Sequence, residues 1–128
     1  MIGIGVDLVD VNRFRTVLQR RAQISERLFT KNELSYCNSA TDPTERLAAR
    51  FAAKEAVMKA LGVGLGAIRF REIEVIKDPS GRPDLKLHGG AAQLAQSSGV
   101  HGWHLSLSHT SSVAVSYTHL TLPTTPYV

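Results

Sequence analysis

Three charged residues in this chain of 128 have the types and spacing to hold a metal ion and a phosphate. Glu55 and Lys59 are four residues apart, which places them on one face of a helix. Asp7, in an apolar segment near the first residue, can add a second carboxylate. Mg²⁺ commonly takes one or two carboxylates from a protein and completes its shell with water and substrate phosphates. The pattern therefore indicates a magnesium and phosphate site, and an ordinary surface ion pair between Glu55 and Lys59 is the simpler alternative.

Two regular elements must position these side chains. Residues 2–8 alternate large apolar side chains with two glycines and Asp7, which predicts a strand. Asp7 then lies on the face opposite the large side chains. An acid followed by proline at residues 42–43 predicts the start of a long, alanine-rich helix, and Gly62 predicts its end.

The rest of the sequence predicts further helices and strands. Expected helices cover residues 11–21, a short stretch that begins near Thr30, and residues 89–98. Expected strands cover residues 68–77, 84–88, 104–108 and 113–116, the first two forming a hairpin. We expect one domain over residues 1–116. Residues 117–128 carry no charge and contain two prolines, so we expect either an irregular, disordered tail or a segment foreign to the natural domain.

Two other segments carry weaker signals. The glycine-rich segment 62–66 matches neither a dinucleotide-binding nor a P-loop pattern, although Gly66 can let the backbone approach a ligand. Ser108 and His109 are adjacent in an expected strand, so their side chains point to opposite faces and cannot exchange a proton directly. A hydroxyl and an imidazole at a strand end suit a bound phosphate, whereas a lone histidine there more often only makes a hydrogen bond.

Composition excludes several classes of protein. The length and the 43% of hydrophobic residues fit one globular domain, and no apolar run approaches the roughly 20 residues of a membrane span. Cys37 is the single cysteine, which excludes an internal disulfide and points to a reducing, cytoplasmic compartment. The net charge of +4 reflects a basic excess early in the chain, which suits an anionic ligand or an acidic protein. Sparse aromatic residues disfavour nucleic acid, and the histidine spacings do not match a zinc site.

Several motifs, taken in order along the chain, resemble those of holo-acyl-carrier-protein synthases, the small bacterial type of 4′-phosphopantetheinyl transferase. The resemblance covers residues 1–116 and rests on the segments Gly3-Ile4-Gly5-Val6-Asp7 with Arg13 following, Phe29-Thr30-Lys31-Asn32-Glu33, Arg50-Phe51-Ala52-Ala53-Lys54-Glu55-Ala56 with Lys59-Ala60-Leu61-Gly62, Gly81-Arg82-Pro83 and Ser106-Leu107-Ser108-His109-Thr110. The segment 50–56 together with the distant strand aspartate is highly specific. The resemblance implies the α+β fold of 4′-phosphopantetheinyl transferases, with an antiparallel sheet packed on a long central helix.

The implied activity is transfer of the 4′-phosphopantetheine group of coenzyme A to a serine of apo acyl carrier protein, with release of adenosine 3′,5′-bisphosphate. The resemblance makes Asp7 and Glu55 ligands of Mg²⁺, and it assigns the phosphates and the leaving group to Lys59. A cation and a lysine there would stabilise the charge that builds on the pyrophosphate. Glu55 and a metal-bound water are both candidates for the base that activates the serine. The alternative is a non-catalytic module that binds coenzyme A or a nucleotide.

The resemblance also implies which residues contact the two substrates. The implied coenzyme A contacts are Arg50, Lys54, Lys59, Gly62, Gly66, Ser108, His109 and Thr110. Arg13, Arg20 and Arg21 would face the acidic helix of the carrier protein, although a solvated surface explains Arg20 or Arg21 equally well. The family forms homotrimers in which neighbouring subunits share each active site. It usually ends in a strand of small and branched apolar residues, where this chain has the segment 117–121, and losing that strand would weaken trimer packing.

Overall fold

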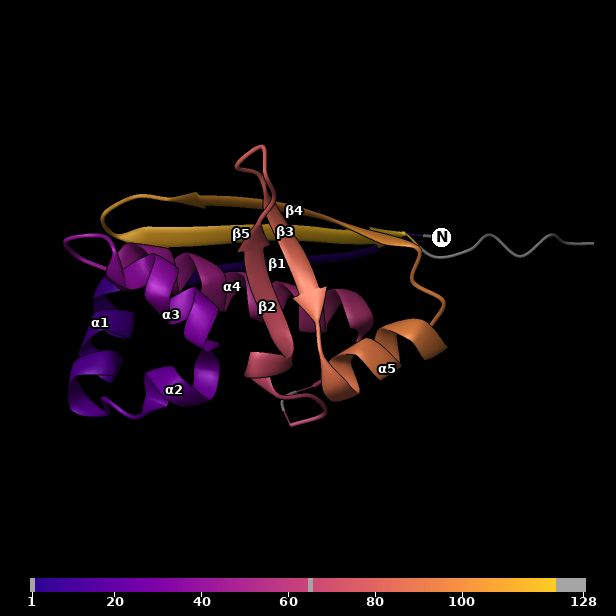
Figure 1. Ribbon diagram of the computed structural model, residues 1–128, viewed down its shortest axis with the longest axis horizontal. Helices are drawn as coiled ribbons and strands as arrows, with labels where there is room; N and C mark the ends of the chain where they lie inside the picture. Colours follow the sequence, from indigo (N-terminus) through magenta and orange to yellow (C-terminus); the bar gives the residue numbers. More distant parts are fainter. Residues whose placement is uncertain (1, 65, 122–128) are drawn as a thin grey trace, which may run out of the picture.

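The computed structural model describes residues 2–64 and 66–121 and shows an antiparallel sheet packed on one long helix (Figure 1). The sheet has the strand order β1 (Ile2–Asp10), β5 (Val113–Thr121) and β4 (Gly102–His109). Helix α4 (Thr44–Leu61) runs beneath the sheet and packs mainly on β1 and β5. The predicted α+β class and the predicted packing of an antiparallel sheet on a central helix are therefore confirmed.

The remaining elements surround α4 on the sides that the sheet leaves open. They are α1 (Val11–Arg20), α2 (Ile24–Leu28), α3 (Lys31–Asn38), the 3₁₀ turn η1 (Phe70–Glu72), β2 (Ile73–Lys77), β3 (Pro83–Leu87) and α5 (Gly89–Ser97). Figure 1 shows α1, α2 and α3 gathered at one end of the molecule, α5 at the other, and the β2–β3 hairpin between them. Helix α2 is an addition to the predicted elements, because its five residues begin without a side-chain cap.

Close packing of β1 on α4 fixes the position of Asp7. A side chain added at Gly5 would collide with the carbonyl oxygen of Ala56, so glycine is needed for this approach of strand to helix. Ala52 and Ala56 are fully buried, and their small side chains allow the strand to pack closely on this side of α4. Asp7 follows Gly5 by two residues and therefore points to the same face of the strand, toward the helix.

Local capping signals set the ends of several helices. The Asp10 carboxylate accepts a hydrogen bond from the backbone N–H of Arg13 and so starts α1. Thr30 and Glu33 form a reciprocal capping box at the start of α3. Gly62 ends α4 with a φ of 73°, in the left-handed region that favours glycine. These ends agree with the sequence predictions because caps depend on residues that are close in the chain.

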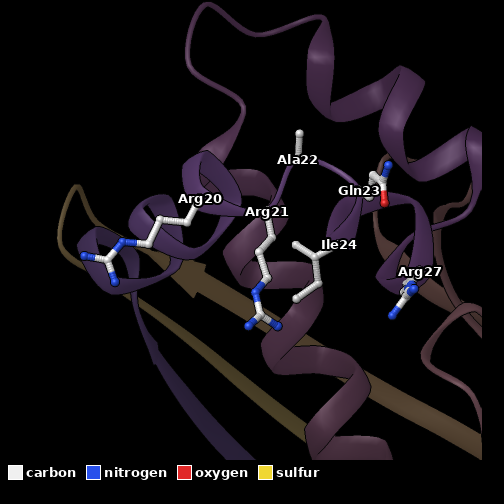
Figure 2. A pocket seen from close by; sticks show the side chains of 6 residues that line it. All are labelled: Arg20, Arg21, Ala22, Gln23, Ile24 and Arg27. Atoms are coloured by element: carbon white, nitrogen blue, oxygen red, sulfur yellow. The ribbon is translucent and has the colours of Figure 1, made fainter.

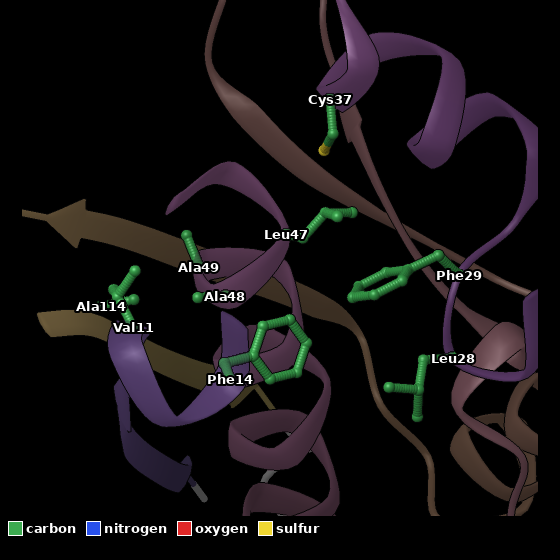
Figure 3. Close-up of a cluster of buried hydrophobic side chains, with 9 residues drawn as sticks. All are labelled: Val11, Phe14, Leu28, Phe29, Cys37, Leu47, Ala48, Ala49 and Ala114. Atoms are coloured by element: carbon green, nitrogen blue, oxygen red, sulfur yellow. The ribbon is translucent and has the colours of Figure 1, made fainter. Parts of the chain in front are cut away.

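The main hydrophobic core lies where α1, α2 and α3 meet α4 (Figure 3). Phe14 stacks on Phe51 with ring centroids 5.2 Å apart, and it meets Phe29 edge to face at 6.3 Å. Phe51 also stacks on Phe70, at 5.4 Å. Cys37 is buried in the same core, and burial raises the pKa of its thiol, so it packs as a small apolar residue. The aromatic stack ties α1 and η1 to the same turn of α4.

The last strand extends beyond the boundary predicted at residue 116. Strand β5 continues to Thr121, and it pairs with both β1 and β4 over this extension. Thr118 and Leu120 are buried against the rest of the protein. The prediction of an irregular segment from Tyr117 onward is therefore wrong for residues 117–121, because pairing on both sides outweighs their unusual composition. The remainder of the predicted tail, residues 122–128, lies outside the described residues.

The outer face of the sheet is apolar and exposed. Ile4, Val6 and Leu8 of β1 are 57%, 50% and 62% exposed, and Tyr117 of β5 is 39% exposed. Contiguous exposed apolar side chains of this kind commonly mark an interaction surface. Within residues 2–64 and 66–121, no helix combines the length and hydropathy needed to cross a bilayer.

Candidate active site

Asp7, Glu55 and Lys59 meet where β1 packs on α4, and we call them the open cluster. Lys59 Nζ lies 2.7 Å from Asp7 Oδ1 and donates a second hydrogen bond to the backbone oxygen of Val6, at 3.2 Å. The Lys59 side chain is 56% exposed, whereas that of Asp7 is 12% exposed. Two carboxylates and an ammonium group from distant parts of the chain thus share a site that solvent and ligands can reach.

The environment of the open cluster disfavours the ionisation of Glu55. Burial, together with a hydrogen bond to Asp7 and the Asp7 charge, raises the pKa of Glu55 to about 7, and Lys59 offsets this only in part. The hydrogen bond from Lys59 to Asp7 raises the pKa of the lysine. An additional cation beside the carboxylates would relieve their repulsion.

This donor set fits Mg²⁺. In the described part of the chain, no three histidine, cysteine or acidic residues converge to form a complete protein cage for a metal. A cation between Asp7 and Glu55 would have two carboxylate ligands from the protein and would need water and phosphate oxygens for the rest. Mg²⁺ is usually bound in this way, because it keeps several waters and accepts substrate phosphates.

Lys54, a predicted coenzyme A contact, lies outside the open cluster, and its surroundings give that prediction no support. Its side chain is fully buried, and Nζ donates hydrogen bonds to Glu33 Oε1 at 2.8 Å, to the backbone oxygen of Phe70 at 2.9 Å and to that of Ile73. These three acceptors occupy the three donor positions of the ammonium group. Burial lowers the pKa of Lys54, while Glu33 favours its charged form.

We call Glu33, Lys54 and Glu74 the closed cluster, since all three are buried. Glu33 also accepts hydrogen bonds from the backbone N–H groups of Thr30 and Val75. Glu74 accepts a hydrogen bond from the Thr30 hydroxyl and lies 3.1 Å from His88 Nε2. The closed cluster thus joins α3, α4 and β2, and its polar groups are used within the protein.

Arg50 and His109 line a hollow of about 370 Å³ that we call the Tyr36 hollow. Three cationic side chains surround the Tyr36 ring, with Arg46, Arg50 and Lys77 at 4.9, 4.6 and 4.7 Å from its centroid. A hydrogen bond to Lys77 lowers the pKa of Tyr36. Arg50 Nε is buried and has no hydrogen-bond partner among the described residues. This concentration of positive charge suits a phosphate group.

Ser108, Thr110 and Gly66 are not among the residues that line the Tyr36 hollow. Ser108 is exposed on β4, and the Thr110 hydroxyl accepts backbone hydrogen bonds from Ser112 and Val113 that hold the β4–β5 turn. Gly66, with a φ of 92°, lines a different hollow beside α2. In the part of the chain that the structure describes, one subunit thus does not gather these residues around the open cluster.

The three arginines predicted to face a carrier protein are all exposed on or just after α1. Arg20 and Arg21 line a hollow of about 520 Å³ together with Arg27. Figure 2 shows Arg21 and Arg27 pointing to the same side of this segment, whereas Arg20 points away from them. Arg13 lines a separate hollow with Leu8 and Phe14. Arg20, Arg21 and Arg27 thus line one hollow, whereas Arg13 lines another.

The fold and the open cluster together define a known class of transferase. A family model described as the 4′-phosphopantetheinyl transferase superfamily matches residues 3–118, and the chain belongs to this superfamily. The holo-[acyl-carrier-protein] synthase of Koribacter versatilis is 45% identical over 118 residues, which cover 91% of this chain and 94% of the relative.

Solved structures agree with this family assignment. The holo-[acyl-carrier-protein] synthase of Neisseria meningitidis superimposes with a TM-score of 0.87 at 32% identity, covering 94% of this chain and 99% of the other. The ACPS–CoA complex of Chronobacterium ammoniagenes has a TM-score of 0.86 at 34% identity, covering 97% and 99%. The two structures share the fold of this chain across nearly its whole length.

Sequence reasoning omitted several basic residues that the structure places at hollows. Arg46 and Lys77 join Arg50 in the Tyr36 hollow, and Arg27 joins Arg21. Arg46 and Arg50 are four residues apart on a predicted helix, and this spacing could have identified Arg46 as a neighbour of Arg50. No comparable local signal connects Lys77 to Tyr36, because the two come from different elements.

Proposed function

We propose that this protein transfers the 4′-phosphopantetheine group of coenzyme A to a serine of apo acyl carrier protein. The observation that carries the proposal is the open cluster, in which Asp7, Glu55 and Lys59 converge from β1 and α4. A module that only binds coenzyme A would not need two carboxylates held so close that the pKa of Glu55 rises to about 7. The names of the relatives, and the coenzyme A bound in the Chronobacterium ammoniagenes complex, support the same substrates.

The residues of the open cluster have distinct tasks in this reaction. Asp7 and Glu55 would hold Mg²⁺, which supplies charge stabilisation at the pyrophosphate. Lys59 binds the phosphates and stabilises the negative charge on the departing adenosine 3′,5′-bisphosphate, since its ammonium group is the exposed member of the cluster. Glu55 and a water held by the cation are the two candidates for the base that accepts the proton of the incoming serine hydroxyl.

The Tyr36 hollow would bind the 3′-phosphate of coenzyme A. Arg46, Arg50 and Lys77 bring positive charge to one place around the Tyr36 ring, and all three line the hollow. His109 lies at the rim, with Nδ1 3.4 Å from the Glu45 carboxylate. We retain Arg50 and His109 as coenzyme contacts and add Arg46 and Lys77 to them.

A homotrimer would complete the site. The predicted contacts Ser108 and Thr110 are exposed at the end of β4 and are therefore available to a neighbouring subunit. The exposed side chains of Ile4, Val6 and Leu8 supply an apolar face for such an interface. We further propose that the enzyme works in the cytoplasm, where the unpaired thiol of Cys37 would stay reduced.

The decisive experiment is a mass measurement of the carrier. Apo acyl carrier protein incubated with coenzyme A, Mg²⁺ and the enzyme should gain the mass of one phosphopantetheine arm. A parallel sample with the metal removed by EDTA should gain none. Several apo carriers should be tried, and failure of all of them to gain mass would rule out the proposed transferase activity. A gain without any divalent cation would instead rule out the magnesium assignment.

A further inference from the structure

The Tyr36 ring lies among three cationic side chains that come from two other elements. Tyr36 itself belongs to α3. Arg46 and Arg50 lie one turn apart on α4, and Lys77 is the last residue of β2. Their charged groups are 4.9, 4.6 and 4.7 Å from the ring centroid, in that order. A cation at such a distance is attracted to the electron-rich face of an aromatic ring. The ring is therefore a contact that all three cations share.

None of the three cations takes part in an ion pair between described residues. The Glu45 carboxylate, at the rim of the Tyr36 hollow, lies instead 3.4 Å from His109 Nδ1. Three like charges around one ring repel one another, and an anion that binds between them relieves this repulsion. The charge of the hollow is therefore arranged for a ligand rather than for an acidic residue of the described chain.

The same part of α3 also limits the positions of the basic side chains. Arg46 Nη1 donates hydrogen bonds to the backbone oxygen of Tyr36 and to Ser39 Oγ, each at 3.3 Å. Arg50 Nη1 donates to the backbone oxygen of Arg46, at 3.2 Å. The Lys77 ammonium group makes a hydrogen bond to the Tyr36 hydroxyl. A guanidinium group has five N–H donors, so both arginines keep donors for a ligand. Long side chains that are already held in place lose less conformational entropy when the ligand binds.

This arrangement suits a phosphate monoester. Such a group carries a charge of about −1.5 to −2 at pH 7 and presents three acceptor oxygens. The 3′-phosphate of coenzyme A is a monoester, whereas dephospho-coenzyme A has an uncharged hydroxyl at that position. The two coenzymes share the pyrophosphate on which the open cluster acts. Contacts in the Tyr36 hollow can therefore distinguish the two coenzymes without a change in the chemical step.

We infer that Tyr36 is a positioning residue that makes the enzyme select coenzyme A over dephospho-coenzyme A, because its ring holds the three cations around the 3′-phosphate. This inference rests on the proposed function and on the place given there to the 3′-phosphate. It adds a determinant of specificity that acts through Arg46, Arg50 and Lys77. A change at Tyr36 should alter the preference between the two coenzymes and leave kcat intact.

The test compares three variants on both coenzymes. Tyr36→Leu removes the ring, whereas Tyr36→Phe keeps the ring and removes the hydroxyl. Leu34→Ala is the matched control, because Leu34 packs on the same hydrophobic core from α3 and does not line the hollow. Transfer to an apo acyl carrier protein with saturating Mg²⁺ gives kcat and KM for each coenzyme. The ratio of the two kcat/KM values is measured on one preparation, so a lower folded fraction cancels from it.

We expect Tyr36→Leu to lower the preference for coenzyme A about ten-fold, through a higher KM for coenzyme A at unchanged kcat. Tyr36→Phe should keep most of the preference, because the ring remains, and Leu34→Ala should keep all of it. An unchanged preference in Tyr36→Leu, or an equal loss in Leu34→Ala, would overturn the role of Tyr36. If the unaltered enzyme uses both coenzymes equally well, the inference fails while the transferase activity stands.

Nucleotide binding separates this inference from the proposed function. Calorimetry with Mg²⁺ present compares adenosine 3′,5′-bisphosphate with adenosine 5′-monophosphate. Tighter binding of the bisphosphate, lost in Tyr36→Leu and kept in Tyr36→Phe, supports the role of Tyr36 without any transfer. If this preference is present but no carrier gains mass, the proposed function fails while the phosphate site held by Tyr36 stands. Equal binding of the two nucleotides to the unaltered protein would overturn the inference.

Discussion

Helix α4 carries two lysines five residues apart whose environments are opposite. Lys54 belongs to the closed cluster, is fully buried, and uses its three protons on acceptors within the protein. Lys59 belongs to the open cluster, is 56% exposed, and pairs with Asp7 while its ammonium group remains accessible. The same residue type in one short motif thus joins elements together in one case and presents charge to a ligand in the other.

The difference between the clusters follows from which elements cover each side of α4. The side at Lys54 is covered by α3 and β2, which contribute Glu33 and Glu74 and exclude solvent. The side at Lys59 meets β1, where Gly5 allows a close approach and Asp7 supplies the carboxylate. A buried ion pair contributes little when intact but costs much when one partner is removed. Changes in the closed cluster should therefore affect folding, and changes in the open cluster should affect the reaction.

The largest expected effect is on the rate of transfer when the open cluster loses a carboxylate. Asp7→Asn and Glu55→Gln should each lower kcat by roughly a thousand-fold or more, because each removes a ligand of the cation that stabilises the developing charge. The carrier mass assay gives the rate, and binding of Mn²⁺ followed by electron paramagnetic resonance gives the metal affinity. In each variant the rate and the Mn²⁺ affinity should fall together, while the melting temperature is unchanged. A variant with a near-normal metal-dependent rate would show that its carboxylate is not a ligand.

The next largest effect is on the free energy of unfolding, which should differ between variants of the two lysines. Lys54→Met should lower the free energy of unfolding by about 3–5 kcal/mol, because it leaves the Glu33 carboxylate buried and unpaired. Lys59→Met should change it by about 1 kcal/mol or less, since exposed ion pairs contribute little, while it slows transfer. Urea unfolding measures both changes. As a control, Glu33→Gln/Lys54→Met should recover part of the stability lost in Lys54→Met alone.

Equal stability of the two lysine variants would contradict the distinction between closed and open clusters. It would mean that the buried pair contributes no more to folding than the exposed one.

The smallest effect concerns the acid side of the stability profile. Burial acts to raise the pKa of Glu74, but hydrogen bonds from Thr30 and His88 outweigh it, so the pKa lies below its usual value of 4.5. A depressed carboxyl pKa stabilises the folded state above pH 4.5, and this contribution is lost as the pH falls through the folded-state value. The melting temperature should therefore fall less steeply between pH 6 and pH 3 for Glu74→Gln than for the unaltered protein. The corresponding difference in the free energy of unfolding should be under about 1 kcal/mol. Parallel profiles would show that Glu74 does not contribute in this way.

Short-range sequence signals were sufficient for most of the elements and for the open cluster. The alternation in residues 2–8 placed Asp7 opposite the large side chains, and helical spacing placed Glu55 and Lys59 on one face. The capping residues Asp10 and Gly62 marked helix ends correctly. Each of these features depends on residues within a few positions of one another, which is why a pattern in the sequence can predict it.

Long-range packing decided what the patterns could not. Lys54 and Lys59 are equally charged residues of one helix, and only the arrival of Glu33 from α3 and of β2 buries the first. Residues 117–121 lack the composition of a core strand, yet pairing with β1 and β4 on both sides makes them one.

The sequence by itself thus determined most of the helices and strands and the chemistry of the reactive groups, because propensity, periodicity and residue type are local properties. The class of fold followed from motifs shared with a known family. The tertiary structure alone decided which lysine is available to a ligand and which arginines line the same hollow. Burial and proximity depend on segments that are distant in the chain, such as Arg27 and Arg71, and these meet only when the whole domain packs.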